Sequence, residues 1–99
     1  MRAISDAADA ARFAAKVIRR HLPDPAYRVF LFGSRATGSE AARSDVDIGI
    51  EGPAPVPRAA LAAIEDEIEE APTLYTIDVV DFARAHEQFR RVAQTRIPL

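Results

Sequence analysis

Residues 27–38 read YRVFLFGSRATG and residues 44–50 read SDVDIGI. The apolar run 27–32 is typical of a buried strand, and it leads directly into the pair Gly33-Ser34, where a strand gives way to a turn or a helix. Backbone N–H groups in such a turn point toward an arriving anion. This part of the chain therefore predicts a β-strand that ends in a phosphate-binding turn.

Two aspartates, Asp45 and Asp47, follow in the second of these stretches. A strand places positions two apart on the same face, so both carboxylates are expected to point the same way. Neighbouring carboxylates resist ionising together, and a divalent cation offsets that repulsion. Hard oxygen ligands suit Mg²⁺, which prefers one or two carboxylates together with waters and substrate phosphates. The pattern predicts a combined metal and nucleotide site.

Ten residues, 35–44, separate Gly33-Ser34 from Asp45. A Gly-Ser pair followed at this spacing by Asp-x-Asp resembles the nucleotidyltransferase superfamily of the polymerase β type. The fuller string of residues 33–48 is similar to its minimal nucleotidyltransferase (MNT) family, and the resemblance covers nearly the whole chain. It implies a small mixed sheet with helices packed mainly on one face and the other face open to a nucleotide.

Hydrophobic periodicity and turn signals along the chain predict four helices and three strands. The expected strands are residues 27–32, 46–51 and 74–80. The expected helices are a first one capped by Ser5 or Asp6 and running to about His21, a short one within 34–42, one over 57–70, and a last one capped by Asp81. Strands that alternate with helices indicate an α/β (α+β) fold with one small mixed sheet of about three strands. The length of 99 residues fits a single domain, 1–99, with one modest core.

A third carboxylate is expected on the strand 74–80. Asp78 lies inside an apolar run, where an unpartnered charge is costly, and a metal explains it best. Asp81 is the rival, but alternation places it on the opposite face, and its position before an amphipathic segment favours a helix-capping role. The resemblance assigns Asp45 and Asp47 to both of two Mg²⁺ ions. It assigns Asp78 to the catalytic ion and to ionising the acceptor hydroxyl.

The nucleotide's phosphates are assigned to the turn. Gly33 is expected to let the backbone approach the β and γ phosphates closely, and Ser34 to donate through its N–H and its hydroxyl. Arg35 has two possible roles, contact with the triphosphate or an ion pair with an acidic side chain elsewhere. ATP is the expected nucleotide substrate.

The composition limits which binding partners and which cellular location are expected. The net charge is −2, so the chain has no bulk attraction to nucleic acid, and a polynucleotide substrate is not expected. No apolar run approaches the roughly 20 residues that span a bilayer. The N-terminus has no apolar segment typical of a signal peptide, and there is no cysteine for an extracellular disulfide framework. These features predict a cytoplasmic protein without a membrane anchor.

The resemblance also implies a partner. Larger superfamily members carry an extra domain that binds the acceptor. In this chain, recognition of the acceptor is therefore expected to come from another protein or subunit. An oligomeric state remains possible. MNT proteins typically accompany a HEPN protein in toxin–antitoxin pairs, which implies transfer of AMP from ATP to a tyrosine of a HEPN toxin. Two alternatives remain: a non-catalytic MNT antitoxin that acts by binding, and a small-molecule transferase resembling the antibiotic-modifying enzymes.

The closing residues, 96–99, carry no further acidic or aromatic anchor. If they normally pack against a partner, they are expected to be disordered in the isolated protein.

Overall fold

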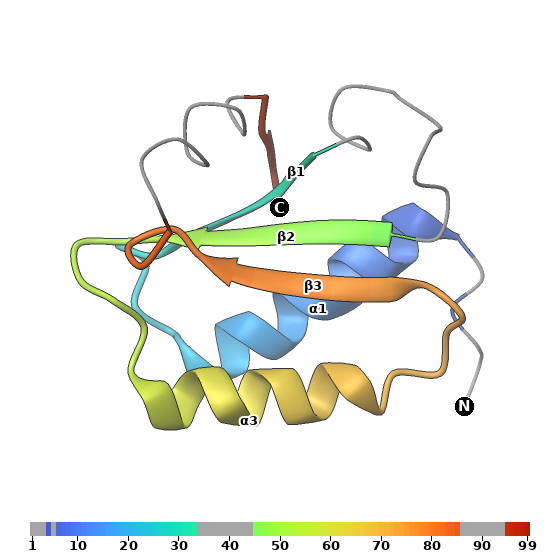
Figure 1. Ribbon diagram of the computed structural model, residues 1–99, viewed down its shortest axis with the longest axis horizontal. Helices are drawn as coiled ribbons and strands as arrows, with labels where there is room; N and C mark the ends of the chain where they lie inside the picture. Colours follow the sequence, from blue (N-terminus) through green and yellow to red (C-terminus); the bar gives the residue numbers. More distant parts are fainter. Residues whose placement is uncertain (1–3, 5, 34–44, 86–94) are drawn as a thin grey trace.

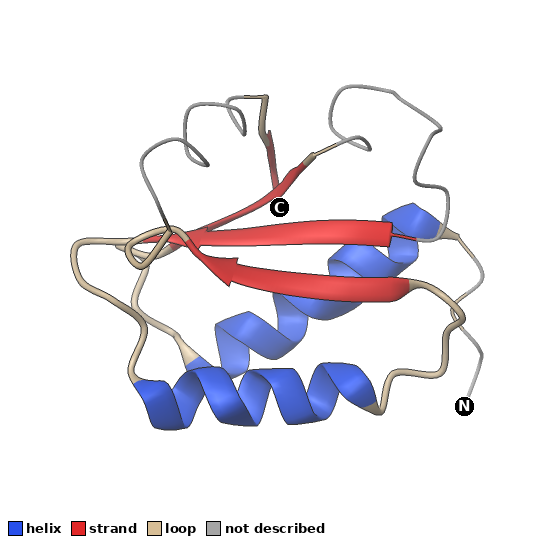
Figure 2. Ribbon diagram, in the orientation of Figure 1, coloured by secondary structure: helices blue, strands red, loops and turns tan. Residues whose placement is uncertain are grey.

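A four-stranded sheet with two helices on one face makes up the part of the chain that the structure, a computed structural model, describes. The described residues are 4, 6–33, 45–85 and 95–99. Figure 1 shows the two helices side by side beneath the sheet, and Figure 2 separates helix from strand by colour. In chain order the elements are α1 (Ala7–His21), β1 (Arg28–Phe32), β2 (Asp45–Glu51), α3 (Arg58–Glu69), β3 (Thr76–Asp81) and β4 (Ile97–Pro98).

The first helix, α1, forms as its sequence predicts. Asp6 is the N-cap, and its carboxylate accepts a hydrogen bond of 2.8 Å from the backbone N–H of Asp9. One stripe of small and branched residues faces the sheet, and its buried members are Ala10, Ala11, Ala14, Val17 and Ile18. The alanines let the helix lie close to the strands, because they bring almost no side chain between the two layers.

The sheet has the order β3-β2-β1-β4, and it is mixed as predicted. β1 and β2 run antiparallel, with Phe32 opposite Asp47. β2 and β3 run parallel, with Asp47 opposite Asp78. Parallel neighbours need a crossover, and α3 supplies it on the helical face of the sheet. This topology places the second and third strands of the sequence side by side.

Alternation along the strands separates the two faces of the sheet. On the helical face, Val46, Ile48 and Ile50 of β2 are fully buried in the main core, together with the helix stripe. The other face carries a smaller aromatic cluster of Phe30, Phe32 and Phe82, with Val80 packed against it. The expectation of helices on one face is therefore confirmed, but part of the opposite face is covered rather than open.

The closing residues correct the expected strand count. Ile97 and Pro98 form a fourth strand, β4, which pairs antiparallel with Leu31 and Phe30 of β1. Arg96 anchors this segment: its guanidinium lies 4.4 Å from the centre of the Phe30 ring and forms an ion pair with Glu51. The tail has no acidic or aromatic anchor, in agreement with its sequence, and its anchor is instead the cation of Arg96, whose aromatic and acidic partners lie on β1 and at the end of β2.

Element boundaries differ from the expected ones by a few residues. β3 begins at Thr76 and ends at Asp81, and Leu74 stands before it with 99% of its surface exposed. α3 begins directly after Pro57, as its sequence predicts. The short helix expected within 34–42 lies outside the described residues, as does the last expected helix beyond residue 85. The expected start of that last helix is wrong, because residues 82–85 form a turn rather than a first helical turn. Within the described part, no helix is long and apolar enough to cross a membrane.

Candidate metal and nucleotide site

Three aspartates from two neighbouring parallel strands lie on the sheet face that turns away from the helices. In β2, Asp45 and Asp47 are half-buried on that face, whereas Val46 and Ile48 between and after them are fully buried on the helical side. The parallel register sets Asp78 directly beside Asp47. Adjacent strands lie about 4.8 Å apart, so these two carboxylates are immediate neighbours. The register thus brings Asp78 next to Asp47, and the convergence of all three carboxylates on one ion stays a prediction.

The pKa of Asp47 reflects its burial and its two acidic neighbours. Burial first, and then the negative charges of Asp78 and Asp45, raise the pKa of the Asp47 carboxyl above its ordinary value. Each of these causes penalises the ionised form. A positive ion placed among the three groups would remove the repulsion and favour ionisation. The site therefore has the electrostatic character of a cation site.

Gly33 ends β1 and lies against Asp47. Its φ of +79° is in the left-handed region that favours glycine. A Cβ atom at this position would collide with the Oδ2 atom of Asp47 and come within 3.3 Å of its Cγ atom. Glycine is thus required twice, once by the backbone and once by the carboxylate. Gly33, the start of the predicted phosphate-binding turn, therefore lies next to Asp47, one of the predicted metal ligands.

The aromatic cluster supports the strands next to the site. Phe82 packs edge-on against Phe30 and Phe32, with ring centres 4.9 and 5.1 Å apart. Gly49 leaves room for it, since a Cβ there would collide with Phe30 and Phe82. Phe32 is also the register partner of Asp47. The cluster therefore packs on the same face of the sheet as the carboxylates, with Phe32 directly beside Asp47.

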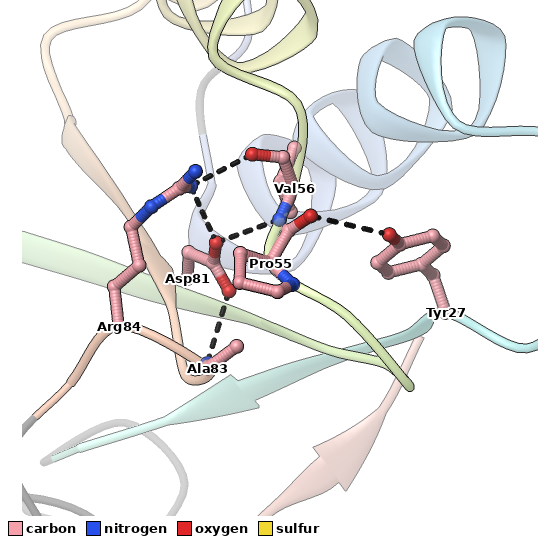
Figure 3. A network of polar contacts seen from close by, with 6 residues as sticks. All are labelled: Tyr27, Pro55, Val56, Asp81, Ala83 and Arg84. Atoms are coloured by element: carbon pink, nitrogen blue, oxygen red, sulfur yellow. Dashed lines mark hydrogen bonds and ion pairs between the residues drawn. The ribbon is translucent and has the colours of Figure 1, made fainter.

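Asp81 has a different environment (Figure 3). It is buried at the end of β3, and one oxygen, Oδ2, accepts hydrogen bonds of 2.8 Å from the Val56 N–H and from the Arg84 guanidinium. The other oxygen accepts one of 3.0 Å from the Ala83 N–H. The Arg84 guanidinium also donates to the Val56 carbonyl oxygen. The prediction that Asp81 points to the opposite face from Asp78 is confirmed, and its carboxylate fastens the connector before α3.

The sequence predicts a helix-capping role for Asp81, with a metal role as the rival, and it does not predict this bond to the connector. The Ala83 contact is the local hydrogen bond typical of an aspartate at a chain reversal. The bond to Val56 spans 25 residues, and no local pattern signals it. Ser34 and Arg35, the other predicted phosphate ligands, lie outside the described residues.

Residues 16–97 match the protein family described as "Polymerase beta, Nucleotidyltransferase". The chain belongs to this family. The superfamily resemblance drawn from the Gly-Ser and Asp-x-Asp pattern is therefore confirmed, and Gly33, Asp45, Asp47 and Asp78 all lie inside the matched range.

A curated relative of this nucleotidyltransferase is the probable protein adenylyltransferase MntA of Haemophilus influenzae. The two are 29% identical over 76 residues, which are 77% of this chain and 65% of the relative. The chain thus spans somewhat less than two thirds of that relative's length. The likeness agrees with the MNT resemblance seen in the sequence.

Solved structures share the fold of this nucleotidyltransferase. A crystal structure of a toxin–antitoxin MntA-HpeT mutant superposes with a TM-score of 0.64 at 19% identity, covering 89% of this chain and 70% of the other. A toxin–antitoxin structure with AMP-PNP gives 0.60, also at 19% identity and with the same coverage. At these identities the likeness concerns the fold.

The donor set suits Mg²⁺. Three carboxylates supply only hard oxygen ligands, and burial together with the negative charges of Asp78 and Asp45 raises the pKa of Asp47. Among the described residues, no three acidic, histidine or cysteine side chains lie where they could together hold a metal ion. An open arrangement fits an ion that completes its octahedron with waters and substrate phosphates.

Proposed function

We propose that this protein is a Mg²⁺-dependent nucleotidyltransferase that transfers AMP from ATP to a hydroxyl group of a partner protein. The partner proposed is a HEPN-family toxin with a tyrosine as acceptor, which makes the chain the antitoxin of the pair. The observation that carries this proposal is the register of β2 and β3, which sets Asp78 beside Asp47 on the face where Gly33 begins the turn.

In the proposed reaction, the acceptor oxygen forms a bond to the α-phosphorus of ATP. The bond between that phosphorus and the bridging oxygen breaks, and pyrophosphate leaves. Asp78 accepts the hydrogen bond of the acceptor hydroxyl and takes up its proton. Asp45 and Asp47 would hold Mg²⁺ together with Asp78, and the bound ion would supply charge stabilisation to the attacking and leaving oxygens.

The turn after β1 holds the phosphates in this proposal. The backbone at Gly33 can come close to an oxyanion because the residue has no Cβ, and Ser34 and Arg35 are proposed to complete the contact. Because Gly33 touches Asp47, a phosphate bound at the turn lies next to the carboxylates. Binding of the phosphates and of the cation should therefore be mutually dependent.

The names of the similar proteins support the proposal of a protein as acceptor and of ATP as the nucleotide. MntA is named a probable protein adenylyltransferase, and the structural neighbours are toxin–antitoxin complexes, one of them with AMP-PNP. One neighbour carries two aspartate-to-glutamate substitutions at positions two apart, the same spacing as Asp45 and Asp47.

The test is incubation with ATP labelled on the α-phosphate, Mg²⁺ and the product of the adjacent gene as the partner. Label should move to the partner with the wild-type protein and stay on ATP with Asp45→Asn and Asp47→Asn. Inhibition of the partner without any labelling, by wild type and variants alike, would select the antitoxin that acts by binding. Labelling of an aminoglycoside or another small alcohol without a partner would select the small-molecule transferase.

A further inference from the structure

A hollow of about 350 Å³ lies between α3 and β3, next to the carboxylate site. Its lining joins Asp78 to two carboxylates of α3, Glu65 and Glu69, and all three residues are exposed. Apolar side chains, among them Ile68 and Ile77, form part of the wall. The described residues that line the hollow include no lysine or arginine. An occupant that brings positive charge would therefore be favoured.

β3 is the outer strand of the sheet on this side. The Phe82 N–H donates to the Ile50 carbonyl across the β2–β3 pair, at 2.9 Å. Backbone direction alternates in a parallel ladder, so the backbone groups of Ile77 and Val79 point away from β2. In the part of the chain that the structure describes, no strand pairs with this edge along 76–81. Such an edge is a template for an added strand.

We propose that this edge and hollow receive the acceptor, as an extended segment of the partner protein that adds to the sheet beside β3. This inference rests on the proposed function and names its substrate class. The residue placed opposite Asp78 shares its sheet face, with side chains about 4.5–5.5 Å apart. A hydroxyl there lies beside the carboxylate that is proposed to take its proton.

The neighbours of that residue face the other way. In a strand, the residues directly before and after the acceptor turn toward the helical side. On that side they meet Glu65 and Glu69 of α3. The structure therefore assigns a basic residue to one or both positions flanking the acceptor. The predicted substrate is a hydroxyl side chain in an extended segment, with arginine or lysine immediately beside it.

Binding measured without ATP tests the inference separately from catalysis. The probe is a fluorescent, end-capped heptapeptide with a central tyrosine between two arginines, and its counterpart has two glutamates in their place. The arginine peptide should bind the wild-type protein, and the double substitution Glu65→Lys, Glu69→Lys should weaken it about tenfold or more. The matched control is Asp66→Lys, Glu70→Lys, which makes the same charge change one position along the same helix, at exposed residues outside the hollow. This control should stay within about twofold of the wild type.

Strand addition has its own test in the peptide backbone. Alternate amides of an extended peptide point to opposite sides, so only one of the two alternate sets would donate to β3. N-methylation of that set removes these donors, and N-methylation of the other set leaves them intact. One methylated arginine peptide should lose binding and the other should keep it. Equal loss in both registers would overturn the added strand.

Two results would overturn the docking surface itself. One is that both double variants weaken the arginine peptide equally, and the other is that neither peptide binds the wild type at millimolar concentration. Failure of the proposed function gives a different pattern: charge-dependent binding as predicted, with no label moving from ATP to the partner or to the peptide. Labelling of the partner that is indifferent to the Glu65 and Glu69 substitutions would keep the function and refute the acceptor groove.

Discussion

Asp78 and Asp81 lie three residues apart on one strand and have opposite surroundings. Asp81 is buried and satisfied by the protein: two backbone N–H groups and the Arg84 guanidinium surround its carboxylate. Asp78 is exposed and stands beside Asp47, whose pKa is raised in part by this neighbour. A carboxylate among donors stabilises the fold, whereas neighbouring carboxylates repel one another, and a cation would offset that repulsion. β3 thus carries one carboxylate that fastens the fold and one that is proposed as a metal ligand.

The largest expected effect comes from the carboxylate side of this comparison. Asp47→Asn should lower the rate of AMP transfer about a thousandfold, because loss of a metal-holding carboxylate removes several kcal/mol of transition-state stabilisation. Its thermal stability without metal should not fall, since the substitution removes the crowded charge. Rate measurements and thermal melts on the same preparation check both. If Asp47→Asn lost stability and kept its rate, Asp47 would be a structural residue and not a metal ligand.

The opposite pattern is expected on the other side. Asp81→Ala leaves the Val56 N–H and the Arg84 guanidinium without their acceptor in a buried place, which should cost about 3 kcal/mol of the free energy of unfolding. Urea denaturation measures that cost. The transfer rate per folded molecule should stay near that of the wild type. A rate loss as large as that of Asp47→Asn would place Asp81 in the site.

Gly33 gives a further test, because it follows β1 and lies against the Asp47 carboxylate. Gly33→Ala should cost about 1–3 kcal/mol of stability through strain at positive φ. It should also raise the Mg²⁺ concentration needed for activity, because the new methyl group displaces the Asp47 carboxylate. Gly52→Ala is the control: its Cβ would collide with Tyr27, so it should cost stability and leave the Mg²⁺ requirement unchanged. Equal Mg²⁺ curves for the two variants would contradict the shared location.

The smallest expected effect is a pH dependence of stability. The folded-state pKa of Asp47 is raised above its ordinary value of 3.8, so the folded protein holds this proton more tightly than the unfolded chain. The metal-free wild type should therefore be less stable than Asp47→Asn at neutral pH. That difference should shrink as the pH falls through the raised pKa and vanish below about 3.8, where Asp47 is protonated in both states. Urea titrations across this range measure it, and a gap that widens toward acid pH would contradict the assigned direction.

Much of this arrangement could be predicted from the sequence, because its signals are local. The cap at Asp6, the apolar stripe of α1, the alternation in β2 and the glycine that follows β1 each act within a few residues. The preference for Asp78 over Asp81 followed from the period of two in a strand, and the structure confirms their opposite faces.

What could not be predicted depends on contacts between distant parts of the chain. β4 is only two residues long and has no periodicity of its own; it forms because Arg96 stacks on Phe30 and pairs with Glu51. The Asp81–Val56 hydrogen bond likewise needs the crossover to be in place. The contact of Gly33 with Asp47 follows from the register of β1 and β2, which no single segment encodes.

The most direct test of the central claim is an anomalous-scattering map from crystals grown with Mn²⁺ and a non-hydrolysable ATP analogue. We expect a metal peak on the face away from the helices, bound directly by oxygens of Asp45 and Asp47, with Asp78 bound to that ion or to a second one and the analogue's phosphates at the Gly33 turn. A map with no peak among these aspartates, while the analogue is bound, would contradict it.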